Sequence, residues 1–183
     1  WYTVGQLHLL DTNVVGQLST FADPSRELDI QFAMGLDDPP TNVFYTVQPY
    51  YMDGHQYLKA VVFTNAYTTH EFTWNPRTVQ YRSWYGHSAQ PTNAGAVIAE
   101  WTYEGADVPG DTNEHIRMNL WMLDGIAPAS SQELVIADFS YACSTGTLFY
   151  DDFENGAIDA FWQTYTSGGG LLSESGGRLR CEP

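Results

Sequence analysis

A strand-like run at residues 26–32 alternates polar and apolar side chains. The polar set, two acids and one amide, is Glu27, Asp29 and Gln31, and the apolar set is Leu28, Ile30 and Phe32. Alternation along a strand places the first set on one face and the second on the other. Acidic side chains are poor strand formers, so three acid or amide groups on one pleat indicate a functional face. We expect the polar face to line an open groove and the apolar row to face the core.

The elements that must position this face are predicted to be β-strands. Short segments rich in β-branched and aromatic residues recur between Gly, Pro, Asn and Asp clusters, at residues 4–10, 42–47, 57–63 and 70–74. The best helical candidate, residues 158–162, is short, so helix should be minor. Many closely spaced strands without a solenoid or propeller repeat favour an all-β, two-sheet sandwich or jelly roll.

Length and composition limit the class of protein. A chain of 183 residues, 43% of them hydrophobic, suits one domain with one sizeable core. The formal net charge of -15 opposes binding to nucleic acid and to anionic membrane surfaces. No run of apolar residues is long enough to span a bilayer. We therefore expect a soluble monomer whose partner is neutral or cationic.

Two cysteines, Cys143 and Cys181, lie far apart in the sequence and form no CxxC pair. This spacing suggests neither a zinc site nor a redox dithiol. The two alternatives are a disulfide bond between them and two buried free thiols.

Three further segments carry distinctive patterns. Residues 69–76 read Thr-His-Glu-Phe-Thr-Trp-Asn-Pro, residues 118–121 read Met-Asn-Leu-Trp, and residues 136–141 read Ile-Ala-Asp-Phe-Ser-Tyr. Together with residues 26–32, they resemble in order and spacing the strands of family 16 glycoside hydrolases, the β-glucanase and laminarinase family. The resemblance covers most of residues 4–142. It implies a secreted protein, extracellular or periplasmic, with a concanavalin-like jelly-roll fold and a β-glucan-like polysaccharide as partner.

The resemblance also implies a role for each polar residue of the first run, because the family's active-site strand reads Glu-x-Asp-x-Glu. Glu27 matches the nucleophile of a retaining glycosidase and Asp29 the helper acid, but Gln31 occupies the acid/base position. Retaining enzymes hold their two carboxyl groups ~5–5.5 Å apart, and one of them donates a proton. An amide cannot donate that proton, and general acid catalysis contributes ~10²–10⁴-fold, so hydrolysis should be impaired. Two other groups could replace the acid: Asp29 itself, and His70 if its strand is a neighbour.

Aromatic rings bind sugars by stacking on the apolar faces of pyranoses, while nearby polar groups orient the sugar. By the resemblance, Trp74, Asn119 and Trp121 are the substrate-binding residues. Asn119 and Trp121 share one face of their predicted strand. For each Trp, packing in the core is the alternative.

No cofactor is required for this chemistry, but the resemblance allows a structural metal. Related domains often hold a calcium ion on the convex side through backbone carbonyls and an Asp of the closing strand. Asp138 is the matching residue, and oxygen ligands of this kind suit calcium. The alternative is a surface Asp without a role.

Residues 149–183 resemble the opening of the fold, although here they come last. A circular permutation would explain this order, with a single jelly-roll domain spanning residues 1–183 and the tail completing a sheet. Cys181 would then lie on a strand within reach of Cys143. In the alternative, residues 149–183 begin the next module of a tandem array.

Three functional hypotheses follow from these patterns. The first is a secreted domain that recognises a β-glucan-like polysaccharide in a concave cleft and hydrolyses it poorly because of Gln31. The second is an active retaining endo-β-glycanase, for β-1,3 or β-1,3-1,4 glucan, in which Gln31 is an engineered change or is functionally replaced. The third is a structural or adhesive sandwich without a groove, which burial of Trp74 and Trp121 would support.

Overall fold

The structure is a computed structural model, and it is nearly all-β. It describes residues 2–5, 14–33, 42–64, 67–110, 114–130, 132–143, 146–166 and 170–182. The helical elements in these ranges are two short 3-10 turns, η2 (Ala94–Ala96) and η3 (Leu123–Gly125). The helical candidate at residues 158–162 is a single turn, in which the Trp162 amide donates to the Asp159 carbonyl at 2.9 Å. In the described residues no helix is long and apolar enough to cross a membrane.

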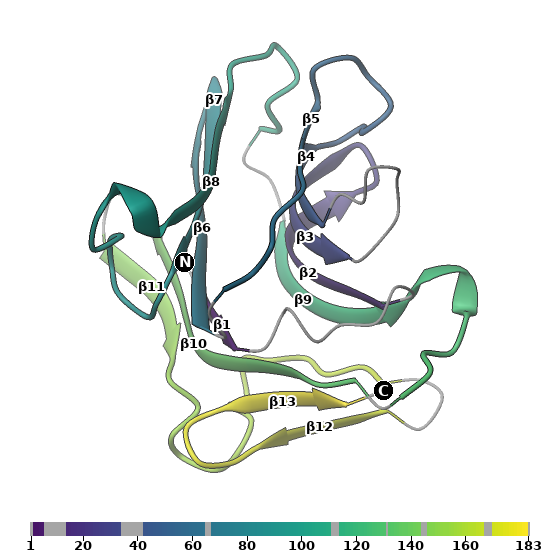
Figure 1. Ribbon diagram of the computed structural model, residues 1–183, viewed down its shortest axis with the longest axis vertical. Coiled ribbons are helices and arrows are strands. Elements are labelled where there is room, and N and C mark those ends of the chain that lie inside the picture. Colours follow the sequence, from purple (N-terminus) through teal and green to yellow (C-terminus); the bar gives the residue numbers. More distant parts are fainter. Residues whose placement is uncertain are drawn as a thin grey trace.

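The strands form two antiparallel sheets, which Figure 1 shows as facing layers. The small sheet has the order β5 (Gln56–Lys59), β4 (Val43–Val47), β3 (Arg26–Ala33), β2 (Val14–Asp23), β9 (His115–Met122). The path of the large sheet is β12 (Leu171–Glu174), β13 (Leu179–Glu182), β10 (Leu134–Cys143), β1 (Tyr2–Gly5), β6 (Tyr67–Asn75), β7 (Thr78–Tyr85), β8 (Val97–Tyr103), and β11 (Gly146–Asp151) also pairs with β10. The prediction of an all-β, two-sheet fold is confirmed, and the jelly-roll arrangement stays a prediction.

The core lies between the two sheets. Leu28, Ile30 and Phe32 of β3 are almost completely buried and pack in one cluster with Tyr81 and Ile136 of the large sheet. The side of β3 that the alternation assigns to the core is therefore the side that meets the large sheet. Burying each such side chain stabilises the fold by ~1.5–3 kcal/mol.

The long strand β10 organises the tail of the chain. One of its edges pairs with β1, and the other is shared by β13, near its start, and β11, near its end. The strands of residues 146–182 thus belong to the large sheet. The circular permutation and the tandem-array alternative both stay predictions.

The register along β10 separates the two cysteines. Cys181 of β13 lies opposite Leu134, the first residue of β10, whereas Cys143 is its last residue. At ~3.3 Å per residue, the two positions are about 30 Å apart. The Cys181 thiol is free and buried. The expectation that Cys181 lies within reach of Cys143 is therefore wrong.

Candidate functional site

The outer face of β3 carries the predicted polar row. Because the core residues of β3 point toward the large sheet, Glu27, Asp29 and Gln31 point away from it. In the small sheet β3 lies between β2 and β4, so neighbouring strands can add side chains to the row from both sides. Glu27 and Gln31 are half-buried, and Asp29 is fully buried.

Asp29 is held by two amides from the neighbouring strands. Nε2 of Gln17, on β2, donates to its Oδ1 at 2.7 Å, and Nε2 of Gln48, directly after β4, donates to its Oδ2 at 3.0 Å. The same Gln17 nitrogen also donates to Oε1 of Glu27 at 3.2 Å. Gln48 is anchored through its backbone amide, which donates to the Glu27 carbonyl at 3.0 Å. Both acids therefore share one network of hydrogen bonds.

Burial raises the pKa of Asp29 to about 8, and the charge of Glu27 beside it acts in the same direction. The hydrogen bonds from Gln48 and Gln17 favour the ionised form and offset part of this rise in the pKa. At neutral pH, Asp29 thus keeps its proton. However, its side chain is inaccessible and an amide binds each of its oxygens, so it cannot deliver that proton to a substrate.

A row of three amide side chains crosses the same face. In the strand register Gln31 lies opposite Gln17, and Gln17 lies opposite Asn119 of β9. Antiparallel partners project to the same side of a sheet, so the three amides are neighbours. Gln31 and Asn119 can offer both donors and an acceptor, which suits the hydroxyl groups of a sugar. Gln17, whose Nε2 donates to Asp29 and Glu27, offers its carbonyl oxygen.

An aromatic and apolar row runs beside the amides. Trp121 of β9 lies opposite Val15, which lies opposite Ala33. The apolar pair forms a small buried cluster with Phe44, whereas the Trp121 side chain is 39% exposed. The structure thus brings Trp121 and Asn119 to the face that carries Glu27, where a pyranose ring could stack on the indole.

Trp74 does not join this site. It lies on β6 of the large sheet, packs partly buried against the core cluster, and donates from Nε1 to the Pro109 carbonyl at 3.0 Å. Alternation along β6 places it on the side of Phe72, which also packs against the core. The assignment of Trp74 to the same cleft is therefore wrong, because its sheet faces the inner side of the small sheet.

His70 cannot replace the missing acid. It is fully buried on β6, with Nδ1 2.8 Å from Oγ of Ser83 and Nε2 2.8 Å from Oγ1 of Thr68. Its ring also lies 4.4 Å, between centroids, from that of Phe32 in the core. Burial lowers the pKa of His70 to about 3, so the imidazole is neutral above that pH. Its strand belongs to the other sheet, which removes it from the row on β3.

Asp138 lies on β10 in register with Thr3 of β1. Nowhere in the described ranges do three or more His, Cys, Asp or Glu side chains gather to hold a metal ion. A calcium ion held mainly by backbone carbonyls with Asp138 stays a prediction, and no chemical step depends on it.

Two residues of the site, Gln17 and Gln48, carry no signal in their own sequence segments. Gln17 belongs to the segment Val-Val-Gly-Gln-Leu-Ser-Thr, residues 14–20, which suggests a strand but does not indicate its partner. Gln48 lies in the turn after β4. Their contact with Asp29 depends on the cross-strand register, which spacing along the chain does not reveal.

No family model, curated protein or solved structure matches the chain. The resemblance to family 16 glycoside hydrolases therefore depends on the sequence motifs, and the site is defined by the contacts described above.

Proposed function

We propose that the protein is a carbohydrate-binding domain that recognises a neutral, β-glucan-like polysaccharide on the outer face of the small sheet. The observation that carries the proposal is that a row of amide side chains lies next to the row that contains Trp121. The amides of Gln31, Gln17 and Asn119 lie in cross-strand register, directly beside the exposed ring of Trp121. Rings that stack on sugars and amides that orient hydroxyl groups are the usual components of glycan sites.

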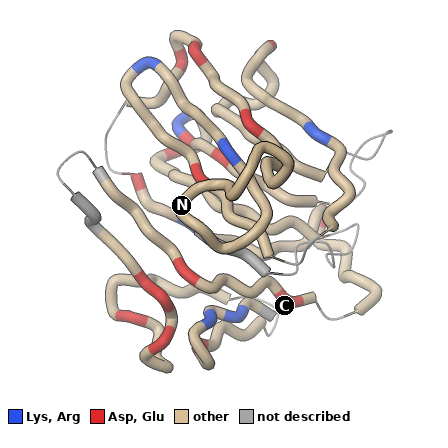
Figure 2. The backbone as a smooth tube through the Cα atoms, turned by 60° about the vertical axis from the view of Figure 1, so that its left-hand side comes forward, with Lys and Arg blue, Asp and Glu red and all other residues tan. Residues whose placement is uncertain are grey.

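The charge of the chain supports a neutral polymer. The sequence has 7 Lys and Arg residues against 22 Asp and Glu residues, and Figure 2 shows the same excess of acidic positions. The site itself adds Glu27 to this acidic background. The net negative charge of the chain and the Glu27 carboxylate would both repel an anionic polysaccharide, whereas neither would repel a neutral glucan.

The same site should bind glycans without cleaving them. Glu27 occupies the position of a nucleophile, and its carboxylate accepts a hydrogen bond from Gln17. Retaining hydrolysis also needs a proton donor at the leaving oxygen. Gln31 cannot donate one, and Asp29 holds its proton where a substrate does not reach it.

A retaining endo-β-glycanase is the second candidate function. The observation in its favour is the pairing of two carboxyl groups with unequal surroundings, since Asp29 stays protonated at neutral pH beside half-buried Glu27. A carboxyl group that burial keeps protonated beside a more accessible carboxyl group is typical of acid–base sites. Because Asp29 is inaccessible and Gln31 has no acidic proton, this candidate requires a proton donor outside these three residues, or a natural Glu at position 31 that was changed to Gln.

A structural or adhesive sandwich is a weaker alternative. Partly buried Trp74 agrees with it, but the exposed ring of Trp121 beside three amides does not.

The test compares three forms of the chain on laminarin, lichenan and a neutral galactan. The forms are the wild type, Gln31→Glu, and the control Gln80→Glu, which makes the same chemical change at an exposed position of β7 in the other sheet. Affinity electrophoresis measures binding, and release of reducing sugar measures hydrolysis.

We expect the wild type to bind one of these glycans without hydrolysis. Gln31→Glu should then release reducing sugar about 10²–10⁴ times faster, because it restores a general acid, while Gln80→Glu should behave as the wild type. Efficient hydrolysis by the wild type would establish the second candidate instead. Failure of both the wild type and Gln31→Glu to bind any glycan would overturn the proposal in favour of a structural role.

A further inference from the structure

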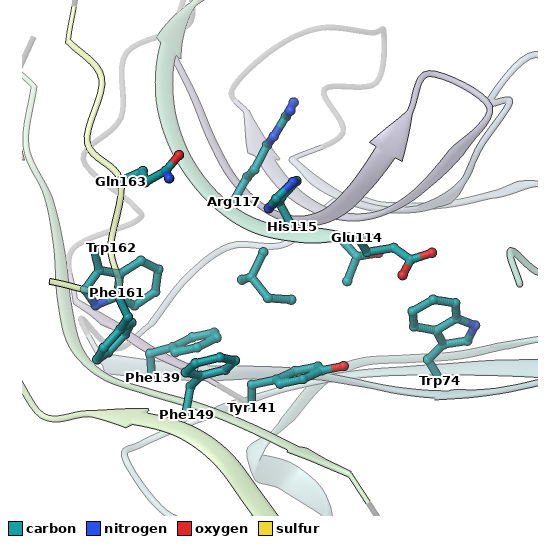
Figure 3. A pocket seen from close by; sticks show the side chains of 12 residues that line it. Trp74, Glu114, His115, Arg117, Phe139, Tyr141, Phe149, Phe161, Trp162 and Gln163 are labelled. Carbon is teal, nitrogen blue, oxygen red and sulfur yellow. The ribbon is translucent and has the colours of Figure 1, made fainter. Parts of the chain in front are cut away.

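A second cavity opens between the two sheets, at a distance from the site on β3. It is a groove of about 630 Å³ along β9, the last strand in the order of the small sheet. Ile116 and Thr20, which are paired across β9 and β2, line it from the small sheet. Strands β10 and β11 and the turn at residues 161–163 line it from the opposite side (Figure 3). Its volume is in the range typical of small-ligand sites.

One wall of the groove is a continuous series of aromatic rings. The centroids of Tyr141 and Phe149 are 6.3 Å apart, those of Phe149 and Phe161 5.6 Å, and those of Phe161 and Trp162 5.3 Å. Figure 3 shows Tyr141 and Phe149 along the base, Phe161 and Trp162 at one end, and Trp74 toward the other. Phe149 and Phe161 are each 45% exposed. Adjacent exposed rings of this kind mark a binding surface rather than a core.

The Trp162 end of this wall is held in place before any ligand arrives. Nε1 of Trp162 donates to Oδ2 of Asp151 at 2.7 Å, and Oδ1 of the same carboxylate accepts from the Phe153 amide at 2.8 Å. The Trp162 ring also packs on Phe139 and Phe153, with centroids at 5.3 and 6.4 Å. A preformed wall reduces the entropic cost of binding.

The polar groups at the groove favour a neutral ligand. Glu114 contributes a carboxylate and Gln163 an amide to the lining. The two basic side chains of the lining, Arg117 and His115, point away from the rings in Figure 3. The Arg117 guanidinium instead lies 3.5 Å from the centroid of the ring of Phe21, on the adjacent strand β2 of the same sheet. An anionic ligand would thus meet a carboxylate and no cation directed at it.

We propose that this groove is a second glycan-binding site, which takes a short neutral oligosaccharide along its row of rings. Aromatic faces beside a carboxylate and an amide match the C–H faces and hydroxyl groups of pyranoses. The groove lies on the inner side of β9, whereas Asn119 and Trp121 lie on the outer side. The inference depends on the lining of the groove and not on the site at β3.

The test is a calorimetric titration with β-1,3- and β-1,4-linked glucose hexasaccharides. Phe149→Ala and Phe161→Ala each remove a half-exposed ring from the groove. Tyr150→Ala is the matched control, because Tyr150 is the next residue of β11, is 53% exposed, and points to the opposite face. Trp121→Ala reports separately on the outer site. Thermal melting confirms that each variant is folded. If one of the two groove variants does not fold, the other still tests the proposal.

We expect Phe149→Ala and Phe161→Ala to weaken hexasaccharide binding at the groove roughly two- to tenfold, while Tyr150→Ala leaves it unchanged. If only Trp121→Ala weakens binding, the groove proposal fails and the outer site stands. If only the groove variants weaken it, the groove stands and the outer site fails. Groove-dependent binding of the uncharged apolar dye Nile red without hexasaccharide binding would assign an apolar ligand and overturn the proposal.

Discussion

Gln17 and Asp29 are joined across β2 and β3 by a hydrogen bond of 2.7 Å from Nε2 to Oδ1. The same nitrogen reaches Glu27 at 3.2 Å, so one amide serves two acids on the neighbouring strand. Hydrogen bonds from Gln17 and Gln48 occupy both oxygens of Asp29 where water is excluded. The charge on this face of β3 therefore depends on the protonation of a side chain that solvent does not reach.

Asp29→Asn should flatten the pH dependence of stability. Burial, followed by the charge of Glu27, raises the pKa of Asp29 from 3.8 to about 8, so the folded protein holds a proton that the unfolded chain releases. The stabilising contribution is complete below about pH 4 and is lost as the pH rises to about 8. Because Asn cannot ionise, the variant should not lose this stability as the pH rises. Urea unfolding at about pH 5 and pH 8 measures the effect, and equal losses in both forms would contradict the assignment.

His70→Gln should reduce the loss of stability in acid. The His70 effect runs opposite to that of Asp29, because here stability is lost as the pH falls. Burial lowers the pKa of His70 from 6.5 to about 3. Below about pH 6.5 the unfolded chain therefore binds a proton that the folded protein does not, and the free energy of unfolding falls as the pH drops toward 3. The variant should cost about 1–3 kcal/mol at neutral pH. Urea unfolding at about pH 4 and pH 7 compares the two forms, with Asp29 present in both; an unchanged acid loss would refute the prediction.

Ile30→Ala should destabilise the fold far more than Gln31→Ala, although the residues are adjacent. Ile30 is fully buried between the sheets, and its truncation should cost ~2–5 kcal/mol through lost burial and the remaining cavity. Gln31 is half-buried on the outer face, and its truncation should cost no more than ~1 kcal/mol. Urea denaturation measures both values, and similar costs would mean that β3 does not face the core as described.

Cys181 should be unreactive in the folded protein. Its thiol is free and buried, and burial raises its pKa to about 11, so the thiolate is scarce at pH 8. A Cys143→Ser background allows Cys181 to be counted alone. We expect Ellman's reagent to detect almost no thiol in buffer and one thiol per chain in urea. Rapid reaction in buffer would show that this end of β13 is open.

The outer site could be predicted from sequence where a local rule applies. The period of two along a strand places Glu27 with Asp29, and Asn119 with Trp121, without knowledge of the fold. This period cannot show that only β2 lies between β3 and β9. For that reason the sequence does not predict that the Gln17 amide lies between these residues.

Errors arose where a conclusion needed the position of one strand relative to another. The pattern around Trp74 indicates a strand correctly, but a short motif does not specify which of two sheets receives it. The separation of Cys143 from Cys181 depends on which end of β10 pairs with β13. Both properties follow from register and sheet order, which are set by packing across the whole domain.

The position of β10 between β1 and β13 has a mechanical consequence. Both neighbours run antiparallel to it, with Ile136 opposite Val4 on one edge and Leu179 on the other. A force pulling Tyr2 away from Glu182 would drag the two outer strands in opposite directions along β10. The load would act in shear on many ladder bonds at once rather than peel them singly. Single-molecule stretching through these two ends should therefore meet greater resistance than stretching that unzips β12 from β13.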